Sequence, residues 1–480
     1  MEYRMYIGGE FVDAKDGGSL EVISPATGEP IREVPYGKKE DAALAVDAAA
    51  DAYPEWSGKN VYERCAFLDR AAAIMRERAD DMARTVTMEV GKPLAESKGE
   101  VMGAIAQFEW YAEEVKRRWG EFVPASANNK RIITTRVPVG VVAAIAPWNF
   151  PVLLMARKVA PALACGCTVI GRPASQTPLG TMAMWNCLHD GGLPPGVANL
   201  ITGSPPDTAD VFMENGHVKK ISFTGSVPVG KELLRKSADS MKKLSLELGG
   251  HSPFIVCDDV SAEEAAERAV FAKYRNMGQV CISPSRFFVP NSMKDEFEEL
   301  ASGRAKALRI GNGLEEGVDV GPLHDSLRVA ETEALVQDVI DKGGRVLAGG
   351  KKPEGPDYEK GFWYEPTVVT DMNADMVLMQ EEPFAPIMPI IGYDDLDDAI
   401  RMANDTVFGL AAYVLTNDIT RAFHLGESLE AGIIGINDPS PAAAQAPFGG
   451  MKASGMGREG GSQGVDAYTE TKYLSIMLKE

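Results

Sequence analysis

Cys281 is the residue of this chain best suited to act as a nucleophile. It lies in the segment Gly278-Gln279-Val280-Cys281, after an expected helix (262–274) and before an expected strand, where glycine and small polar residues leave a thiol accessible. A thiolate there would attack an electrophilic carbon and form a covalent intermediate. A free cysteine is more often a buried core residue, so the interpretation of Cys281 depends on what else the sequence offers.

Glu247 and Asn149 offer the base and the hydrogen-bond donor that such a reaction needs. Glu247 lies within the apolar, strand-like segment 244–250, which closes on two glycines, and burial there would raise its pKa into the range of a general base. The alternative is a structural carboxylate that accepts backbone N–H groups. Asn149 lies in the two-proline turn 147–151, directly after an expected strand, where parallel-sheet enzymes place ligands. Its amide can donate to an oxyanion or form an Asx-turn.

Residues 223–230 predict a phosphate site, because they follow an expected strand and open an expected helix. The backbone N–H groups and helix dipole around Gly225 and Ser226 would face a pyrophosphate, unless the segment is a plain turn. Glu232 stands where a P-loop requires serine or threonine, which excludes an ATPase site. Residues 455–460 match GxGxxG but follow no expected strand, so we assign them no cofactor role.

The elements that position these residues divide into three groups. The first quarter predicts helices at 39–52, 63–90 and 94–119. Short apolar strands then alternate with helices in two series, which predicts an α/β fold with two doubly wound parallel-sheet domains. The expected strands are 139–145, 167–170, 197–201, 220–223 and 254–256, then 286–289, 345–347, 364–369, 387–390 and 410–414. Two outlying strands, 131–136 and 473–478, could extend a sheet across a subunit boundary.

The composition is that of a multidomain globular enzyme: 480 residues, 45% of them hydrophobic, with a formal charge of −20. That charge argues against nucleic acid as a partner. The chain shows neither a secretion signal nor an apolar stretch of membrane length, so we expect a cytoplasmic protein. Its six cysteines lie mostly in apolar runs as reduced thiols do, and their spacing predicts no metal site.

Taken in order, these segments resemble the aldehyde dehydrogenase superfamily over almost the whole chain. The resemblance includes the segments 381–386 and 447–455 besides those described above. It implies a dinucleotide-binding domain at 1–120 and 139–248, a catalytic domain at 249–440, and a β oligomerisation arm at 121–138 and 462–480. The family also implies a homodimer or homotetramer.

The family mechanism implies a role for each candidate residue. The Cys281 thiolate would attack an aldehyde, Asn149 would stabilise the oxyanion, and Glu247 would activate the water that hydrolyses the resulting thioester. The cofactor would be NAD or NADP, with Glu382 on the nicotinamide ribose and Phe384 beside it. Further cofactor-lining residues by the same resemblance are Trp148, Arg172, Gly225 and Ser226.

Two departures from the family pattern affect the cofactor. Pro383 and Ala385 flank Phe384, and this rigid turn could change how Glu382 meets the ribose. Arg172 replaces the usual lysine, and Ser175 replaces the glutamate of many NAD-using members. Loss of that carboxylate removes repulsion toward a 2′-phosphate, which Arg172 can bind. NADP is therefore favoured over NAD, unless the arginine merely faces solvent.

Arg157 and Arg275 bear on the substrate, because their positions match the pair that holds the distal carboxylate in succinate-semialdehyde and 2-oxoglutarate-semialdehyde dehydrogenases. We therefore expect a carboxylate-bearing semialdehyde. Against this, Ala442 to Ala444 fill the stretch where the succinate-semialdehyde enzymes supply a serine. The alternatives are a broad-range enzyme for aliphatic or aromatic aldehydes, with both arginines in structural ion pairs, and, more distantly, a non-catalytic protein on the same fold.

Overall fold

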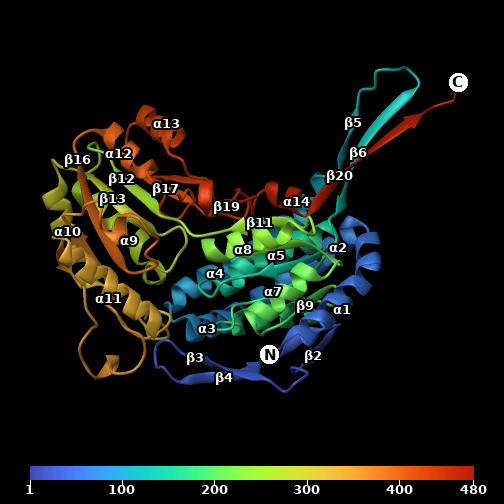
Figure 1. The fold of residues 1–480 in the computed structure, drawn as a ribbon, viewed down its shortest axis with the longest axis horizontal. Coiled ribbons are helices and arrows are strands. Elements are labelled where there is room, and N and C mark those ends of the chain that lie inside the picture. The colour runs from blue at the N-terminus through green and yellow to red at the C-terminus, as the bar shows by residue number, and fades with distance from the viewer. Residues whose placement is uncertain (480) are drawn as a thin grey trace.

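The larger of two central sheets carries the first series of strands. The computed structural model describes residues 1–479, and this sheet runs β19-β11-β10-β7-β8-β9-β1-β2 (Figure 1). Its five middle strands are parallel, as predicted, whereas β19, β1 and β2 join antiparallel at the edges. The strands are β1 (Met5–Ile7), β2 (Glu10–Val12), β7 (Val141–Ile145), β8 (Thr168–Arg172), β9 (Ala198–Leu200), β10 (Val218–Thr224), β11 (Lys243–Glu247) and β19 (Gly455–Met456).

Helices cover both faces of this sheet, and the side chains of β7 point alternately toward the two helical layers. Val142 and Ala144 join the apolar cluster that contains α5 (Pro151–Cys165), whereas Val141 and Ala143 join the cluster on the α1 side (Lys39–Gly58). Because successive strand residues point to opposite faces, one short apolar strand serves two cores. The other helices of this lobe are α2 (Val61–Glu77), α3 (Ala79–Val90), α4 (Leu94–Glu114), α6 (Leu179–Asp190), α7 (Pro205–Glu214) and α8 (Val227–Ser237).

The prediction of one helix over 63–90 was wrong. The chain breaks at Arg78, which ends α2 and precedes α3 with φ −101° and ψ 10°. The break turns α3 onto α4 and α6, and no glycine or proline marks it in the sequence. The helix predicted to reach residue 119 also ends earlier, at Glu114.

The second sheet carries the later strands in the order β14-β15-β16-β13-β12-β17-β18. It is parallel except at β14, which pairs antiparallel with β15 and is the exception to the predicted parallel order. Its strands are β12 (Ser252–Val256), β13 (Pro284–Pro290), β14 (Arg345–Ala348), β15 (Thr367–Thr370), β16 (Ile387–Tyr393), β17 (Ala411–Leu415) and β18 (Ile433–Ile436), and its helices are α9 (Ala262–Tyr274), α10 (Lys294–Ala307), α11 (Ser326–Asp341), α12 (Leu396–Asn404) and α13 (Ile419–Ser428). The helix predicted at 262–274 has these bounds in the structure.

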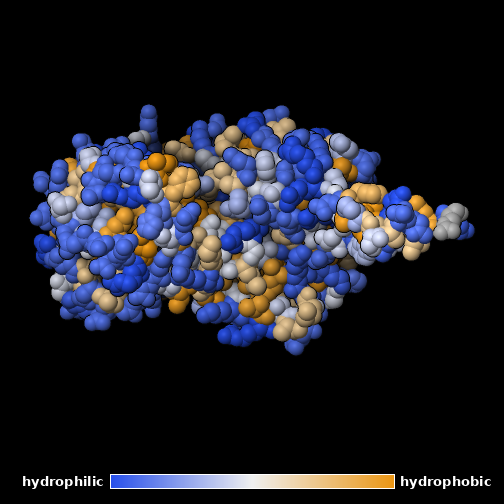
Figure 2. Space-filling model, turned by 90° about the horizontal axis from the view of Figure 1, so that it is seen from above, coloured by the Kyte–Doolittle hydropathy of each residue, from blue (hydrophilic) through white to orange (hydrophobic). Residues whose placement is uncertain are grey.

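The two predicted outlying strands pair with each other and form an arm that projects from the body (Figure 1). β6 (Lys130–Pro138) and β20 (Thr469–Met477) run antiparallel along their whole length, and β5 (Gly120–Val123) adds a third strand. Phe122 and Met477 are each 67% exposed, and apolar residues mark the arm in Figure 2. The arm therefore presents apolar surface that this chain leaves uncovered.

Two smaller elements lie outside the sheets and helices described above. A two-stranded hairpin, β3 (Ser19–Ile23) with β4 (Pro30–Pro35), lies at the N-terminal side, and α14 (Gln463–Ala467) precedes the arm. Over residues 1–479, no helix is long and apolar enough to cross a membrane. The same residues contain no group of three or more His, Cys, Asp or Glu placed to hold a metal ion.

Candidate active site

The structure brings the predicted nucleophile, base and amide to one place. Cys281 lies on the loop before β13, and Asn149, on the loop after β7, donates from Nδ2 to the backbone oxygen of Gln279 at 3.0 Å. A Cβ atom on Gly250 would lie 2.7 Å from the Cys281 carbonyl oxygen, so the segment that follows Glu247 lies against the same loop. Three loops far apart in the sequence therefore converge.

The loop before Cys281 has an unusual backbone. Asn276 and Met277 have φ values of +43° and +54°, and Gly278 follows at +71°. Left-handed conformations are costly for residues with a Cβ and persist only where their surroundings impose them. Gln279 supplies part of that constraint, because its Nε2 donates to the Asn276 oxygen at 3.0 Å and its Oε1 accepts from the His324 N–H at 2.9 Å.

The Cys281 thiol is held in its protonated form. Burial, with smaller contributions from the nearby carboxylates of Glu382 and Glu247, raises the pKa of Cys281 to about 12, while Arg157 acts to lower it. A cationic neighbour favours the thiolate and Arg157 acts in that direction, but burial and the two carboxylates outweigh it. The five other cysteines are buried, and none of the six is in a disulfide.

Glu247 has the properties predicted for a base. It ends β11 with 2% of its surface exposed, and neither carboxylate oxygen has a hydrogen-bond partner within residues 1–479. Burial raises the pKa of Glu247 well above its usual range, and the neighbouring Glu459 adds to the effect. The alternative of a carboxylate saturated by backbone N–H groups is wrong.

Arg157 and Arg275 line one cavity of about 520 Å³. The Arg157 guanidinium is 4% exposed and lies 4.1 Å from the Phe448 ring centroid, and no carboxylate of residues 1–479 forms an ion pair with it. Arg275 donates from Nη1 to the Ser440 hydroxyl at 3.2 Å. The cavity is completed by Glu96, Gly99, Glu100, Gly103, Ala106, Gln107, Phe150, Leu153, Ala442, Ala443, Ala444 and Gln445.

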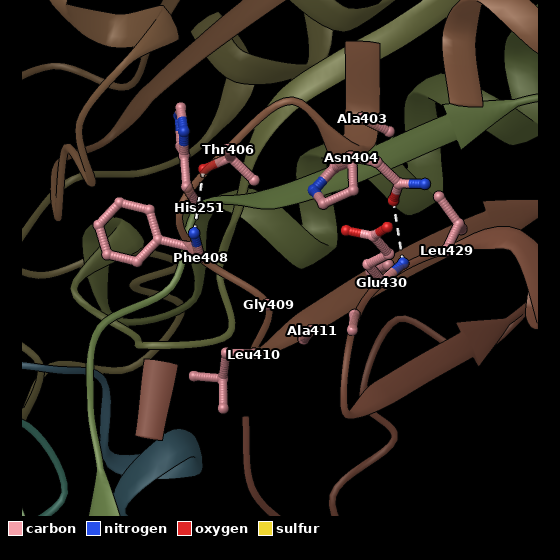
Figure 3. A pocket seen from close by; sticks show the side chains of 13 residues that line it. His251, Ala403, Asn404, Thr406, Phe408, Gly409, Leu410, Ala411, Leu429 and Glu430 are labelled. Carbon is pink, nitrogen blue, oxygen red and sulfur yellow. Dashed lines mark hydrogen bonds between the residues drawn. The ribbon is translucent and has the colours of Figure 1, made fainter. Parts of the chain in front are cut away.

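The hollow drawn in Figure 3 is a different place. It is lined by His251, Phe408, Asn404 and Glu430 among others, and has room for about 10 Å³. The dashed bonds there run from the Phe408 N–H to Thr406 and from the Glu430 N–H to Asn404. That volume suits one water molecule, so this hollow cannot admit a substrate, whereas the cavity beside Arg157 has the room.

An aromatic group lies beside the nucleophile loop. The Trp148 ring stacks on His324 with centroids 4.2 Å apart, and Phe384 meets the same indole edge-on at 5.6 Å. Phe384 has a φ of +43° in the turn flanked by Pro383. The Glu382 carboxylate accepts from the Gly250 N–H at 3.1 Å, and burial raises its pKa to about 7. Trp148, Phe384 and Glu382 thus belong to one region, as predicted.

Arg172 and Ser175 lie together at the end of β8. Arg172 Nη2 donates to the Ser175 hydroxyl at 3.2 Å and to the Gly203 oxygen at 3.0 Å. Its Nε is buried and has no partner among the residues that the structure describes. At the end of β10, a Cβ on Gly225 would collide with the Phe223 ring, and the exposed Ser226 is the N-cap of α8.

The sequence and the fold match known proteins over almost their full length. Residues 11–474 match the sequence profile of the aldehyde dehydrogenase family. The chain belongs to the aldehyde dehydrogenase family. It is 44% identical to a glutarate-semialdehyde dehydrogenase of Pseudomonas putida over 98% of this chain and 97% of that protein. It is 43% identical to an NADP(+) succinate-semialdehyde dehydrogenase of Escherichia coli over 98% and 97%.

Other matches extend this picture. A 3-sulfolactaldehyde dehydrogenase of Pseudomonas putida is 42% identical over 99% of this chain and 97% of that protein. A crystal structure of an aldehyde dehydrogenase from Brucella melitensis biovar abortus has a TM-score of 0.97 at 40% identity, and covers 100% of this chain and 98% of that one. The resemblance predicted from the ordered segments is therefore confirmed, and so is the α/β fold class.

This aldehyde dehydrogenase presents groups that suit an NAD(P) cofactor. The Nε of Arg172 is a buried donor at the carboxyl end of β8, and it has no hydrogen-bond partner among residues 1–479. Doubly wound sheets bind dinucleotides at this end of their strands. The eleven-residue helix α8 begins after Gly225 and Ser226, so its first N–H groups can face a phosphate. NAD or NADP fits these positions.

Two residues beside Glu247, Lys158 and Glu459, were not predicted from the sequence. They form a buried ion pair, and Lys158 Nζ also donates to the Thr224 hydroxyl at 2.6 Å. Glu459 influences Glu247 directly. It lies within the GxGxxG match at 455–460 that we gave no cofactor role. The pairing of β19 with β11 and the bridge between Glu459 and Phe448 bring it close to Glu247.

Proposed function

We propose that this enzyme oxidises an aldehyde that carries a carboxylate at its far end, a semialdehyde of a dicarboxylic acid, to the corresponding diacid. The observation that carries the proposal is the Arg157 guanidinium, which is buried beside the cavity with no carboxylate partner within residues 1–479. A buried cation without a counter-ion is costly. A substrate carboxylate between Arg157 and Arg275 would remove that cost.

The names of the relatives and the lining of the same cavity bear on the charge and length of the substrate tail. The relatives named above act, by their names, on glutarate semialdehyde, succinate semialdehyde and 3-sulfolactaldehyde, and these aldehydes share an anionic far end. Ala442 to Ala444 line the cavity and offer it no hydroxyl, but Ser440 supplies one beside Arg275. We therefore favour a four- or five-carbon semialdehyde, with 2-oxoglutarate semialdehyde among the candidates.

The first chemical step would use Cys281 and Asn149. The thiol would release its proton to solvent, and the sulfur would attack the aldehyde carbon while the C=O π bond opens to give a thiohemiacetal oxyanion. The second N–H of the Asn149 amide and the Cys281 backbone N–H would donate to that oxygen. A bound NAD(P) would supply the hydride acceptor for this oxidation, and Cys281 would then hold the acyl group as a thioester.

The second step would use Glu247. With its raised pKa, this carboxylate can take a proton from water near neutral pH. The hydroxide equivalent then adds to the thioester carbonyl, the C–S bond breaks, and the acid leaves while the thiol is restored. A CoA-acylating enzyme would not need this base, so Glu247 supports release of the free acid.

We further propose NADP as the preferred cofactor. Arg172 would bind the 2′-phosphate, and Ser175 leaves room for it where a glutamate would repel it. Trp148, Gly225 and Ser226 would line the remainder of the dinucleotide. Glu382 would hold the nicotinamide ribose beside Phe384.

The same proposal assigns the parts of the chain. Residues 1–120 and 139–248 would bind the dinucleotide, residues 249–440 would carry the catalytic loop, and the arm (121–138 and 462–480) would join subunits into a homodimer or homotetramer. The apolar surface of the arm supports this, because edge strands with exposed apolar side chains pair readily with a second chain. Six free cysteines favour a reducing compartment such as the cytoplasm.

Steady-state kinetics test the proposal directly. NAD(P)H absorbance would be followed with succinic, glutaric and 2-oxoglutarate semialdehydes, propanal and benzaldehyde, each with NAD and with NADP. We expect at least one semialdehyde to exceed the uncharged aldehydes in kcat/KM by about 10-fold or more, the value of one charge-assisted hydrogen bond. Equal values for propanal would replace the proposal with a broad-range dehydrogenase.

A further inference from the structure

We infer that the start of helix α4 positions the oxyanion amide against the nucleophile, through Glu96 and Glu100 on the helix and Lys92 just before it. These three are positioning residues, since they hold the two loops that carry Asn149 and Cys281 and touch neither reacting atom. The inference rests on the proposed roles of Cys281 and Asn149. It adds to them a device that sets the spacing of those two groups.

Glu100 and Lys92 form hydrogen bonds with the loop that carries Asn149 and with the start of α5. Both are fully buried and form an ion pair. Lys92 Nζ also donates to the Asn149 backbone oxygen at 2.9 Å and lies 3.7 Å from the centroid of the Phe150 ring. The other oxygen of Glu100 accepts the N–H groups of Val152 and Leu153, at 2.8 and 3.2 Å. The loop is thereby fixed at a carbonyl and at the start of α5.

Glu96 forms hydrogen bonds with the loop that leads to Cys281. Its two carboxylate oxygens accept the Asn276 N–H at 2.9 and 3.2 Å. Asn276 is the first residue of the left-handed turn, and its side chain donates to the Gln279 oxygen at 3.2 Å, the same oxygen that accepts from Asn149. Glu96 therefore constrains the strained backbone directly before the nucleophile.

The carboxylates of Glu96 and Glu100 lie on one face of α4. Glu96 and Glu100 are four residues apart, so they lie one turn from each other on the same side of α4. Each binds a different loop, and one helix thus fixes the distance between them. The Lys92 ammonium acts to lower the pKa of Glu96, so its charge links Glu96 and Glu100 into one polar cluster. This cluster is buried at Lys92 and Glu100 and half-buried at Glu96.

A stabilising role alone does not account for this cluster. A buried ion pair is often no more stable than apolar residues of the same volume, so the pair is not needed to pack α4. Two left-handed non-glycine residues also need an external constraint. Misplacement of a donor by about 1 Å can cost on the order of 100-fold in rate, and the cluster acts at the two loops where such a shift would matter.

The test uses a charge-free double variant, Lys92→Met with Glu100→Gln, which leaves no unpaired buried charge. We expect kcat for succinic semialdehyde and the pre-steady-state rate of NADPH formation to fall at least 10-fold, with KM changed less than threefold, because the tail arginines remain. Lys98→Ala is the matched control. Lys98 lies on the exposed face of α4 and pairs with Asp80, and its removal should leave both constants unchanged.

A double-mutant cycle separates positioning from general damage. If the cluster acts through Asn149, the double variant should slow an Asn149→Ala enzyme by less than twofold. An additive loss would overturn the inference. If Asn149→Ala itself leaves the rate of NADPH formation unchanged, the proposed function fails instead, and the two failures are distinguishable.

Glu96 has its own readout, the rate at which iodoacetamide alkylates Cys281. Glu96→Leu removes the acceptor for Asn276 and should change that rate at least threefold, while Glu96→Gln keeps an acceptor and should restore it. Circular dichroism and melting temperature identify a variant that fails to fold. A folded Glu96→Leu enzyme with unchanged alkylation and turnover would refute this part of the inference.

Discussion

The Glu247 carboxylate lies close enough to that of Glu459 for the second charge to raise the pKa of the first. Glu459 is itself paired with Lys158, which lowers the pKa of Glu247. The base is therefore tuned by a balance between a carboxylate and an ammonium group. This balance, together with burial, decides the pH range in which Glu247 can accept a proton from water.

The first prediction concerns that balance. Glu459→Gln removes a cause of the raised pKa and leaves Lys158, which lowers it, so the pKa of Glu247 should fall. The acidic limb of kcat against pH should then move to lower pH, by on the order of one unit for the loss of one nearby like charge. Glu470→Gln, at an exposed position on the arm, is the control and should not move the limb. A shift to higher pH would contradict the assignment of Glu247.

The second prediction concerns the substrate tail. Arg157→Leu and Arg275→Leu should each raise KM for succinic semialdehyde, by about 10- to 100-fold if each loses a charge-assisted hydrogen bond of about 1.5–3 kcal/mol. Propanal has no carboxylate, so its kcat/KM should change little in Arg275→Leu. In Arg157→Leu it should fall less than that of succinic semialdehyde, because only the effect of Arg157 on the pKa of Cys281 is lost. Parallel losses for both substrates would mean that the arginines support the fold, and the broad-range alternative would stand.

The third prediction follows from the protonated thiol. Since the pKa of Cys281 is about 12, the thiolate fraction rises about tenfold per pH unit below that value. Alkylation of Cys281 by iodoacetamide in the absence of cofactor should therefore accelerate from pH 7 to pH 10 without a plateau. Arg157→Leu removes a cation that lowers this pKa and should slow alkylation at every pH. A plateau near pH 8 would show that the thiol is ionised more easily than its surroundings indicate.

Much of the fold could be predicted because its elements are locally encoded. The bounds of α9 follow from a serine N-cap at Ser261 and an alanine-rich buried face, and β7 follows from a short run of small apolar residues. The break at Arg78 could not be predicted, because α2 and α3 separate through packing against different partners, without glycine or proline. The antiparallel edge strands depend likewise on distant pairings, such as β19 with β11.

The site could be predicted only where a residue lies in a distinctive local segment. Cys281 and Asn149 lie in glycine- or proline-containing turns beside a strand, Glu247 ends β11 shortly before two glycines, and the structure brings the three together. Glu459 lies 212 positions after Glu247 in the sequence numbering, and Glu96 is 180 positions before Asn276. Contacts at such separations are made by tertiary packing, and no local sequence pattern predicts them.

The fourth prediction reverses the cofactor preference. Ser175 accepts a hydrogen bond from Arg172 at 3.2 Å, so a carboxylate introduced by Ser175→Glu would pair with the guanidinium and compete with a 2′-phosphate. KM for NADP should rise about 10- to 100-fold, the range for loss of a charge-assisted bond, while KM for NAD changes little. Ser175→Gln has the same length without the charge and should retain NADP use. Cofactor Kd from quenching of tryptophan fluorescence gives a second readout, and if Glu and Gln variants behave alike, Arg172 does not bind the 2′-phosphate.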